Sequence, residues 1–175
     1  MKRFVKAIIV LLCVFAGTLA NGSDDREHQL KAAFIFNFAK FITWPSFSGT
    51  GDPIVIGVYK DDGYLPDLNA ALGGKSVLGH PFVVRKIDSE AQVTACNLAL
   101  IGEVGREEIG HLSRMCKGTG TVLVGDEEGF AQNGGTIGFV IEANRIRFDI
   151  NQQSAKAANV SISSKLLSLA RTVYQ

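Results

Sequence analysis

Apolar residues recur at helical spacing near the start of the chain and predict a first helix from Asp24 to Ile42. One face of this helix carries apolar residues at intervals of four, four and three: Leu30, Phe34, Phe38 and Phe41. Trp44-Pro45 ends the helix, because a residue that precedes proline avoids the α region. A buried helix needs such a stripe, so we interpret it as a core face; docking on a partner or a lipid surface is the alternative.

Short apolar runs along the middle of the chain predict buried strands over residues 53–59, 81–87, 97–101 and 120–125. Helical segments are predicted between them, from Asp61 to Leu72, with Gly73-Gly74 after it, and from Gly105 to Cys116. Strands that alternate with helices are typical of a largely parallel sheet with helices on both faces.

The last part of the chain shows a different pattern. Residues 136–141 and 145–150 are two apolar runs joined by Glu142-Ala143-Asn144, which predicts an antiparallel hairpin at the edge of the sheet. A final helix is predicted over residues 162–173. No repeat or linker divides the chain, so we expect one α/β domain over residues 21–175: a largely parallel sheet flanked by helices, with an antiparallel C-terminal hairpin.

The first 20 residues have the three parts of a secretory signal peptide. Lys2, Arg3 and Lys6 precede an apolar run over residues 7–16, and Thr18-Leu19-Ala20 offers small residues for cleavage after Ala20. The run is too short for a membrane span. A lipid-bearing role for Cys13 is disfavoured, because the residue before it is not small. The sequence therefore predicts an exported protein.

Loss of this segment changes the charge balance. Three of the 18 basic residues and none of the 17 acidic ones lie in it, so the mature chain has 15 against 17 and a net charge of −2. This balance disfavours nucleic acid and a polybasic membrane contact as partners.

Two cysteines remain in the mature chain, and we expect Cys96 and Cys116 to form a disulfide. In a right-handed β–α–β crossover both positions fall at the same edge of the sheet. We interpret the bond as a structural staple, with a redox-sensitive switch as the alternative. No zinc site is expected, because His28, His80 and His111 have no ligand spacing near them.

Several short motifs have a plain structural interpretation. Asp126-Glu127-Glu128 follows a predicted strand, where carboxylates could perform acid–base chemistry or bind a cation, but we favour a solvated turn. Asp61-Asp62 is interpreted as a helix start, and Gly118-Thr119-Gly120 as a turn rather than a cofactor loop. Arg145 and Arg147 share a strand face that could bind an anion or simply face solvent. Without a nucleophile–base pair, we predict no enzyme, no cofactor and no metal.

Five sequence blocks together resemble the YfiR family of exported proteins. They begin at Lys31-Ala-Ala-Phe-Ile-Phe-Asn-Phe-Ala-Lys-Phe-Ile-Thr-Trp-Pro45 and continue through residues 96–102, 129–135, 146–151 and 163–170, in the family's order. The residues that carry the resemblance are Lys31, Asn37, Phe38, Lys40, Trp44, Pro45, Gly129, Phe130, Gly134, Gly135 and Asn151.

The resemblance implies a periplasmic α/β regulator without catalysis. Characterised members of the family bind the periplasmic sensory domain of an inner-membrane diguanylate cyclase and inhibit it; release raises cyclic di-GMP and promotes biofilm growth. Redox state acts on those members through disulfides, and a homodimer is compatible with the resemblance. The alternative is a periplasmic small-ligand-binding protein that reports to a sensor kinase or an outer-membrane receptor. A ligand binder should have a deep apolar pocket, whereas an inhibitor should expose an apolar patch.

Overall fold

The computed structural model of the chain describes residues 22–45, 47, 49 and 51–175. The predicted signal peptide, its cleavage site after Ala20 and Cys13 lie outside these residues. Among the described residues, no helix combines the length and apolar character that a bilayer span requires.

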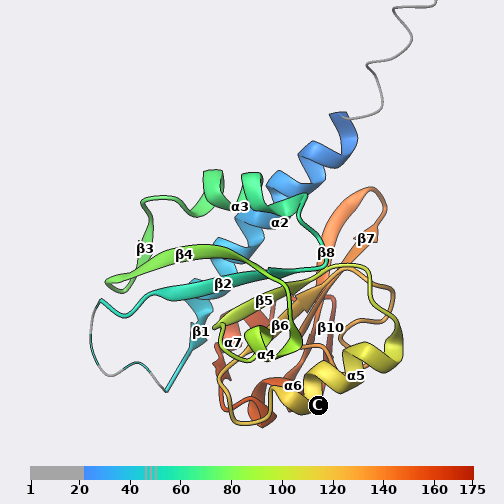
Figure 1. The fold of residues 1–175 in the computed structure, drawn as a ribbon. Coiled ribbons are helices and arrows are strands. Elements are labelled where there is room, and N and C mark those ends of the chain that lie inside the picture. Colours follow the sequence, from blue (N-terminus) through green and yellow to red (C-terminus); the bar gives the residue numbers. More distant parts are fainter. Residues whose placement is uncertain (1–21, 46, 48, 50) are drawn as a thin grey trace, which may run out of the picture.

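A mixed eight-stranded sheet forms the centre of the α/β fold (Figure 1). Its strand order is β10-β8-β7-β6-β5-β2-β4-β3. The strands are β2 (Ile54–Tyr59), β3 (Ser76–Val77), β4 (His80–Ile87), β5 (Leu98–Ile101), β6 (Val122–Gly125), β7 (Ile137–Glu142), β8 (Arg145–Asn151) and β10 (Thr172–Tyr174). Strands β4, β2, β5, β6 and β7 pair in parallel, as the apolar runs predicted.

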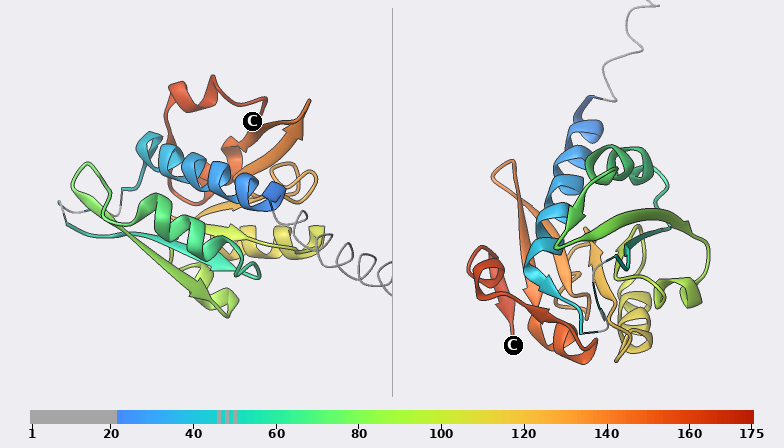
Figure 2. Two further views of the ribbon diagram at one scale, coloured as in Figure 1. Left: turned by 90° about the horizontal axis from the view of Figure 1, so that it is seen from above. Right: turned by 90° about the vertical axis from the view of Figure 1, so that its left-hand side faces the viewer.

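Helices cover the two faces of the sheet with two separate cores. Helices α2 (Gly22–Phe41) and α3 (Tyr64–Leu72) lie side by side on one face (Figure 2). The predicted core face of α2 is confirmed at Phe38, whose ring centroid lies 5.0 Å from Phe148 and 5.7 Å from Phe139. It is wrong at Leu30, which is 56 % exposed because it lies near the start of α2, outside the larger core. Helices α4 (Glu90–Val93) and α5 (Arg106–Met115) bury Val93, Ile109 and Leu112 in the smaller core on the opposite face.

The opposite face lacks a helix where the chain passes from β6 to β7. Residues 126–136 form turns instead, and the turns follow the Gly-rich sequence predicted to be a loop. A parallel β–β connection usually carries a helix that covers the sheet. On that face this loop lies over β7, where a Cβ at Gly138 would meet Ala131 and Phe130, and the loop borders an open space at the carboxyl end of β6.

The predicted final helix over residues 162–173 is wrong. The chain forms the helix α6 (Gln152–Ala157), the two-residue strand β9 (Ser161–Ile162), the single-turn helix α7 (Ser164–Leu167) and strand β10. Strand β9 pairs antiparallel with β1 (Ile42–Thr43), which directly follows α2. The β-branched and aromatic residues of β10 favour a strand, and β8 offers a free edge for it.

The β7–β8 hairpin is antiparallel as predicted, with Phe139 opposite Phe148, but it does not form the edge of the sheet. Strand β10 pairs in parallel with β8 and lies outside it. The antiparallel strand at the opposite edge is β3, a short strand that the sequence did not predict.

Candidate functional site

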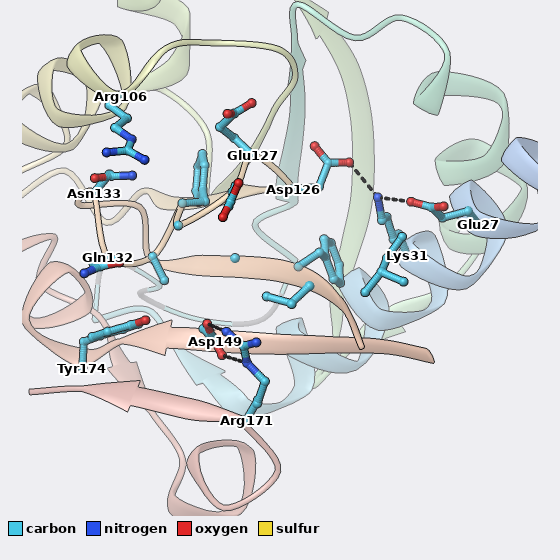
Figure 3. A pocket seen from close by; sticks show the side chains of 18 residues that line it. Glu27, Lys31, Arg106, Asp126, Glu127, Gln132, Asn133, Asp149, Arg171 and Tyr174 are labelled. Atoms are coloured by element: carbon cyan, nitrogen blue, oxygen red, sulfur yellow. Dashed lines mark hydrogen bonds and ion pairs between the residues drawn. The ribbon is translucent and has the colours of Figure 1, made fainter. Parts of the chain in front are cut away.

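A polar cavity of about 840 Å³ lies beside the turns that follow β6 (Figure 3). Helix α2 contributes Glu27 and Lys31, and α5 contributes Arg106. The rest of the wall comes from residues 126–133, from the β7 residues 138–141, and from Asp149, Arg171 and Tyr174. Charged and polar groups dominate this wall, so the cavity differs from the deep apolar pocket expected of a typical ligand binder.

Lys31 is the most enclosed charged group in the wall. Its side chain is 3 % exposed. The Nζ atom lies 2.6 Å from a carboxylate oxygen of Glu27 and 2.6 Å from a carboxylate oxygen of Asp126. The Tyr64 hydroxyl donates a hydrogen bond of 3.2 Å to the same Asp126 oxygen. Burial lowers the pKa of Lys31, but its hydrogen bonds to Asp126 and Glu27 outweigh burial and hold the pKa above its ordinary value. Lys31 therefore stays charged and joins α2 to the end of β6.

Tyr64 connects this ion pair to a second group of polar side chains. His28 stacks on Tyr64 with ring centroids 4.1 Å apart, and its Nδ1 lies 3.9 Å from Asp67. Burial, and then the charge of Asp126, raise the pKa of Tyr64 above its ordinary value. The phenol therefore remains protonated and acts as a hydrogen-bond donor.

A second ion pair crosses the lower part of the cavity. Arg171, which precedes β10, donates to both carboxylate oxygens of Asp149 on β8, at 2.9 and 2.6 Å. Asp149 is 5 % exposed, so this bidentate pair satisfies a buried charge. It also holds the residue before β10 against β8, the strand with which β10 pairs.

Other charged groups of the wall have no such partner. No ion pair among the described residues involves Arg106, Glu127 or Glu128, and all three are exposed. Figure 3 shows Arg106 and Glu127 on the side of the cavity away from Arg171. The cavity therefore presents one guanidinium and two carboxylates that can bind a polar ligand or a partner's side chains.

The loop that borders the cavity is held by the residues that carry the family resemblance. Phe130 is buried between Gly125 and Gly135, and a Cβ at either glycine would collide with its ring. The Asn151 side chain donates to the Ala131 carbonyl and accepts from Ser154 N–H, both at 2.8 Å, which ties the loop to the start of α6. Gly129 and Gly134 adopt φ values of +70° and +108°, which favour glycine.

The remaining residues of the resemblance lie on or beside α2. Phe38 and Trp44 are buried in the larger core, and Pro45 is exposed in the turn after β1. Asn37 and Lys40 are exposed, and Lys40 Nζ donates to Asn37 Oδ1 at 3.4 Å. Neither of these two side chains contributes to the core.

Cys96 and Cys116 are both buried in the smaller core, and the structure contains them as free thiols, without the expected disulfide. Cys96 Sγ donates to the Gln92 carbonyl at 3.3 Å and accepts from Arg85 at 3.7 Å. Burial raises the pKa of Cys116 to about 11 and also raises the pKa of Cys96. Each thiol is therefore protonated near neutral pH, and the disulfide stays a prediction about the oxidised protein.

Other sequence candidates lie apart from the cavity or have structural roles. Asp61 precedes α3, and Asp62 pairs with Lys86 at 2.6 Å. Arg145 and Arg147 are exposed on β8, and Gly118 and Gly120 donate backbone hydrogen bonds of 2.8 Å to Ala157 and Ala158. Within the described residues, no group of three or more His, Cys, Asp or Glu side chains is placed to hold a metal ion.

The cavity does not lie at β2, the point where the order of the parallel strands reverses. Strand β2 has β4 on one side and β5 on the other, and ligands of open α/β sheets often bind beyond such a point. Here Gly102 N–H donates to the Tyr59 carbonyl at 2.8 Å, and a Cβ at Gly102 would collide with the Lys60 carbonyl. Close backbone contact fills that position, and the cavity lies further along, at β6.

Sequence comparison agrees with the resemblance carried by these residues. Comparison with curated proteins finds no match. The YfiR/HmsC-like family (DUF4154) matches residues 28–171, which include Lys31, the loop after β6, both cysteines and Arg171. Because this match covers most of the sequence, the chain belongs to the YfiR/HmsC-like family.

Proposed function

We propose that the mature chain is a periplasmic inhibitor that binds the sensory domain of an inner-membrane diguanylate cyclase, lowering cyclic di-GMP and biofilm formation. The observation that carries this proposal is the family match over residues 28–171. It spans both cores and the ion pairs of Lys31 and Arg171, so the whole folded unit corresponds to the family.

Inhibition of this kind needs a difference in affinity between two conformations of the cyclase. A regulator shifts an equilibrium only by binding one conformation more tightly than the other. Moving a cyclase from 99 % active to 99 % inactive requires a preference of about 10⁴-fold. A preformed binding surface favours such a preference, and the Lys31 and Arg171 ion pairs hold the elements around the cavity in one arrangement.

The test is the level of cyclic di-GMP in cells with and without the gene. Deletion should raise the level, and a second deletion, of the cyclase that is inhibited, should return it to the starting value. The matched control is a chain that lacks residues 1–20 and stays in the cytoplasm; it should fail to restore the low level. An unchanged level after the first deletion would contradict the inhibitor proposal.

Export and assembly are part of the same proposal. Mass spectrometry of the periplasmic protein should show Asn21 as the first residue, which corresponds to cleavage after Ala20. A retained segment of residues 1–20 would contradict it. Light scattering of the purified mature protein tests the homodimer, which should have twice the mass of one chain.

The polar cavity favours a second candidate function, in which the chain binds a small polar ligand and reports it to a sensor. Its volume is in the range of small-molecule sites, and Arg106, Glu127 and Glu128 have no ion-pair partner among the described residues. Replacing Arg106 by Ala and both glutamates by Gln should abolish a ligand response and leave the fold intact. If the triple variant restores cyclic di-GMP as fully as the unmodified chain under every growth condition, the cavity is not required.

A further inference from the structure

A group of exposed lysines and phenylalanines lies on the face of the molecule formed by α2 and the β3–β4 hairpin. Lys40 Nζ lies 4.1 Å from the ring centroid of Phe36, and Lys75 Nζ lies 4.9 Å from the same ring. Phe36 contacts Phe82 of β4 with centroids 5.7 Å apart. We call these four residues the lysine–phenylalanine face. Both lysines are exposed, and both rings are partly exposed.

Acidic residues are absent from the two chain segments that form this face. No Asp or Glu occurs in residues 28–51 or 68–87, the two segments that contribute the face. In the described part of the chain, Lys40 and Lys75 form no ion pair. Lys31, Lys60 and Lys86 each lie 2.6 Å from a carboxylate oxygen. Within the described residues, the fold thus pairs three of its lysines with carboxylates and leaves Lys40 and Lys75, like the exposed Lys117 and Lys156, without a counter-charge. Lys40 and Lys75 differ from those two lysines because both lie beside the same aromatic ring.

Two ammonium groups beside one ring repel each other, and the attraction of an exposed aromatic ring for a cation is weak. Carboxylates of a partner that pair with Lys40 and Lys75 would offset this repulsion and form a charge-assisted hydrogen bond with each ammonium group. The rings provide apolar contact area, and Leu78, in the turn of the β3–β4 hairpin, is 86 % exposed. The face thus fits a segment that carries carboxylates beside apolar side chains.

Other occupants fit the face less well. In a two-fold dimer the same patch meets itself, which would bring four lysines together without an acid. Membrane surfaces bind clusters of about four to eight basic residues, and this face has two in a mature chain with a net charge of −2. An acidic protein segment matches both the charge and the size of the face.

We propose that the lysine–phenylalanine face docks an acidic segment of the membrane protein that this chain regulates. The identity of that protein as a diguanylate cyclase rests on the proposed function, whereas the face and the acidic character of its partner do not. Two residues of the family resemblance, Asn37 and Lys40, lie on or beside this face and are exposed. A contact with a partner protein gives these two exposed side chains a role.

Site-specific photocrosslinking in cells tests the docking directly. Asn37 is replaced by p-benzoylphenylalanine in the full exported chain, and the matched control carries the same group at Gln153, which is exposed on α6. We expect a crosslink from position 37 only, mapped by mass spectrometry to a peptide rich in Asp or Glu. The crosslink should fall at least tenfold in the variant Lys40→Glu/Lys75→Glu.

Two further variants separate charge from folding. Lys40→Arg/Lys75→Arg keeps the charge and should retain the crosslink. Lys117→Glu/Lys156→Glu makes the same charge change at exposed lysines elsewhere and should leave it unchanged within twofold. Equal midpoints of thermal unfolding for all variants establish that each variant folds.

The outcomes distinguish the two proposals. An acidic peptide from a cyclase sensory domain supports both, and one from another membrane protein supports the face and contradicts the proposed function. A crosslink to a second copy of this chain or to lipid, or no crosslink, overturns the docking proposal. So does a crosslink that survives Lys40→Glu/Lys75→Glu.

Discussion

Helix α2 carries two lysines in opposite surroundings. Lys31 is 3 % exposed, and its ammonium group lies 2.6 Å from two carboxylates, one on α2 itself and one at the end of β6. Lys40 is exposed over the ring of Phe36, and among the described residues no carboxylate pairs with it. The residue type and the helix are the same, so the neighbours alone decide what each charge does.

The difference separates charges that hold the fold from charges that are available to a partner. At Lys31 the charge is used within the molecule, where it joins α2 to the loop beside the cavity. At Lys40 the charge stays in solvent, where an exposed ion pair would add less than about 1 kcal/mol in any case. Stability should therefore depend on the first lysine, and binding on the second.

The largest expected effect is the loss of stability in Lys31→Met. The variant leaves Glu27 and Asp126 side by side without their shared cation, while a side chain of similar length keeps the packing. Removing one partner of a fully buried pair costs about 3–5 kcal/mol. Both carboxylates are about one-third exposed and can be rehydrated, so we expect a loss of about 3 kcal/mol in the free energy of unfolding.

Denaturant unfolding of the purified mature protein measures this loss. Glu27→Gln/Lys31→Met/Asp126→Asn is the matched control, because it removes the repulsion together with the cation and should recover part of the loss. A change below 1 kcal/mol in Lys31→Met would mean that the ion pair does not join α2 to the sheet.

A buried pair of thiols in the smaller core gives an effect of similar size. If Cys96 and Cys116 form a disulfide in the oxidised protein, the bond closes a loop of about 20 residues, worth roughly 3 kcal/mol in the loop-entropy model. The oxidised protein should therefore unfold at higher denaturant concentration than the reduced protein, and Cys96→Ser should lose the difference. Equal unfolding midpoints would contradict the bond.

The reduced protein should also lose stability at alkaline pH. Burial raises the pKa of Cys116 to about 11, above its value in the unfolded chain. The folded state then retains a proton that the unfolded state releases, so stability is complete below about pH 8.5 and falls as the pH rises toward 11. A pKa difference of one corresponds to about 1.4 kcal/mol, and screening by water reduces it, so we expect on the order of 2 kcal/mol. Unfolding of Cys116→Ala should show a shallower pH dependence; an identical slope would contradict the raised pKa.

A smaller change in the loop beside the cavity should follow from Gly135→Ala. The added methyl group collides with the ring of Phe130, which must move within its buried site. Overpacking of this kind costs typically 1–3 kcal/mol, and we expect about 1–2 kcal/mol by thermal or denaturant unfolding. Gly105→Ala is the control, since nothing lies within 4 Å of its added Cβ. Equal stability of the two variants would show that Phe130 is not held by Gly135.

The longer elements from α2 to β8 could be predicted from the sequence, because each carries its own periodicity, whereas the short elements β1, β3 and α4 could not. The helical stripe of α2 and the apolar run of β2 need only local residues to be recognised. The C-terminal segment could not, because its structure depends on distant partners. Leu166, Leu167 and Val173 have helical spacing, but β10 forms against β8, and Arg171 is fixed by Asp149.

The candidate site was predictable only in part, for the same reason. Asp126-Glu127-Glu128 could be placed beyond the end of a strand, and they do line the cavity. Nothing local indicates that Lys31 reaches Asp126, 95 positions along the chain, because that contact exists only once α2 lies across the sheet. The family resemblance marked Lys31 without giving its role, and the structure provides it.

The smallest expected effect on stability belongs to Lys40→Met/Lys75→Met, and it completes the comparison of the two lysines. Both side chains are exposed, and their contacts with the ring of Phe36 are offset by the repulsion between them, so the free energy of unfolding should change by less than about 0.5 kcal/mol. The photocrosslink from position 37 should nevertheless fall, because the carboxylates of the partner lose both cations. Lys31→Met, assayed at a temperature where it remains folded, should keep that crosslink within twofold. A double variant that unfolds as readily as Lys31→Met would show that Lys40 and Lys75 serve the fold, and the contrast along α2 would disappear.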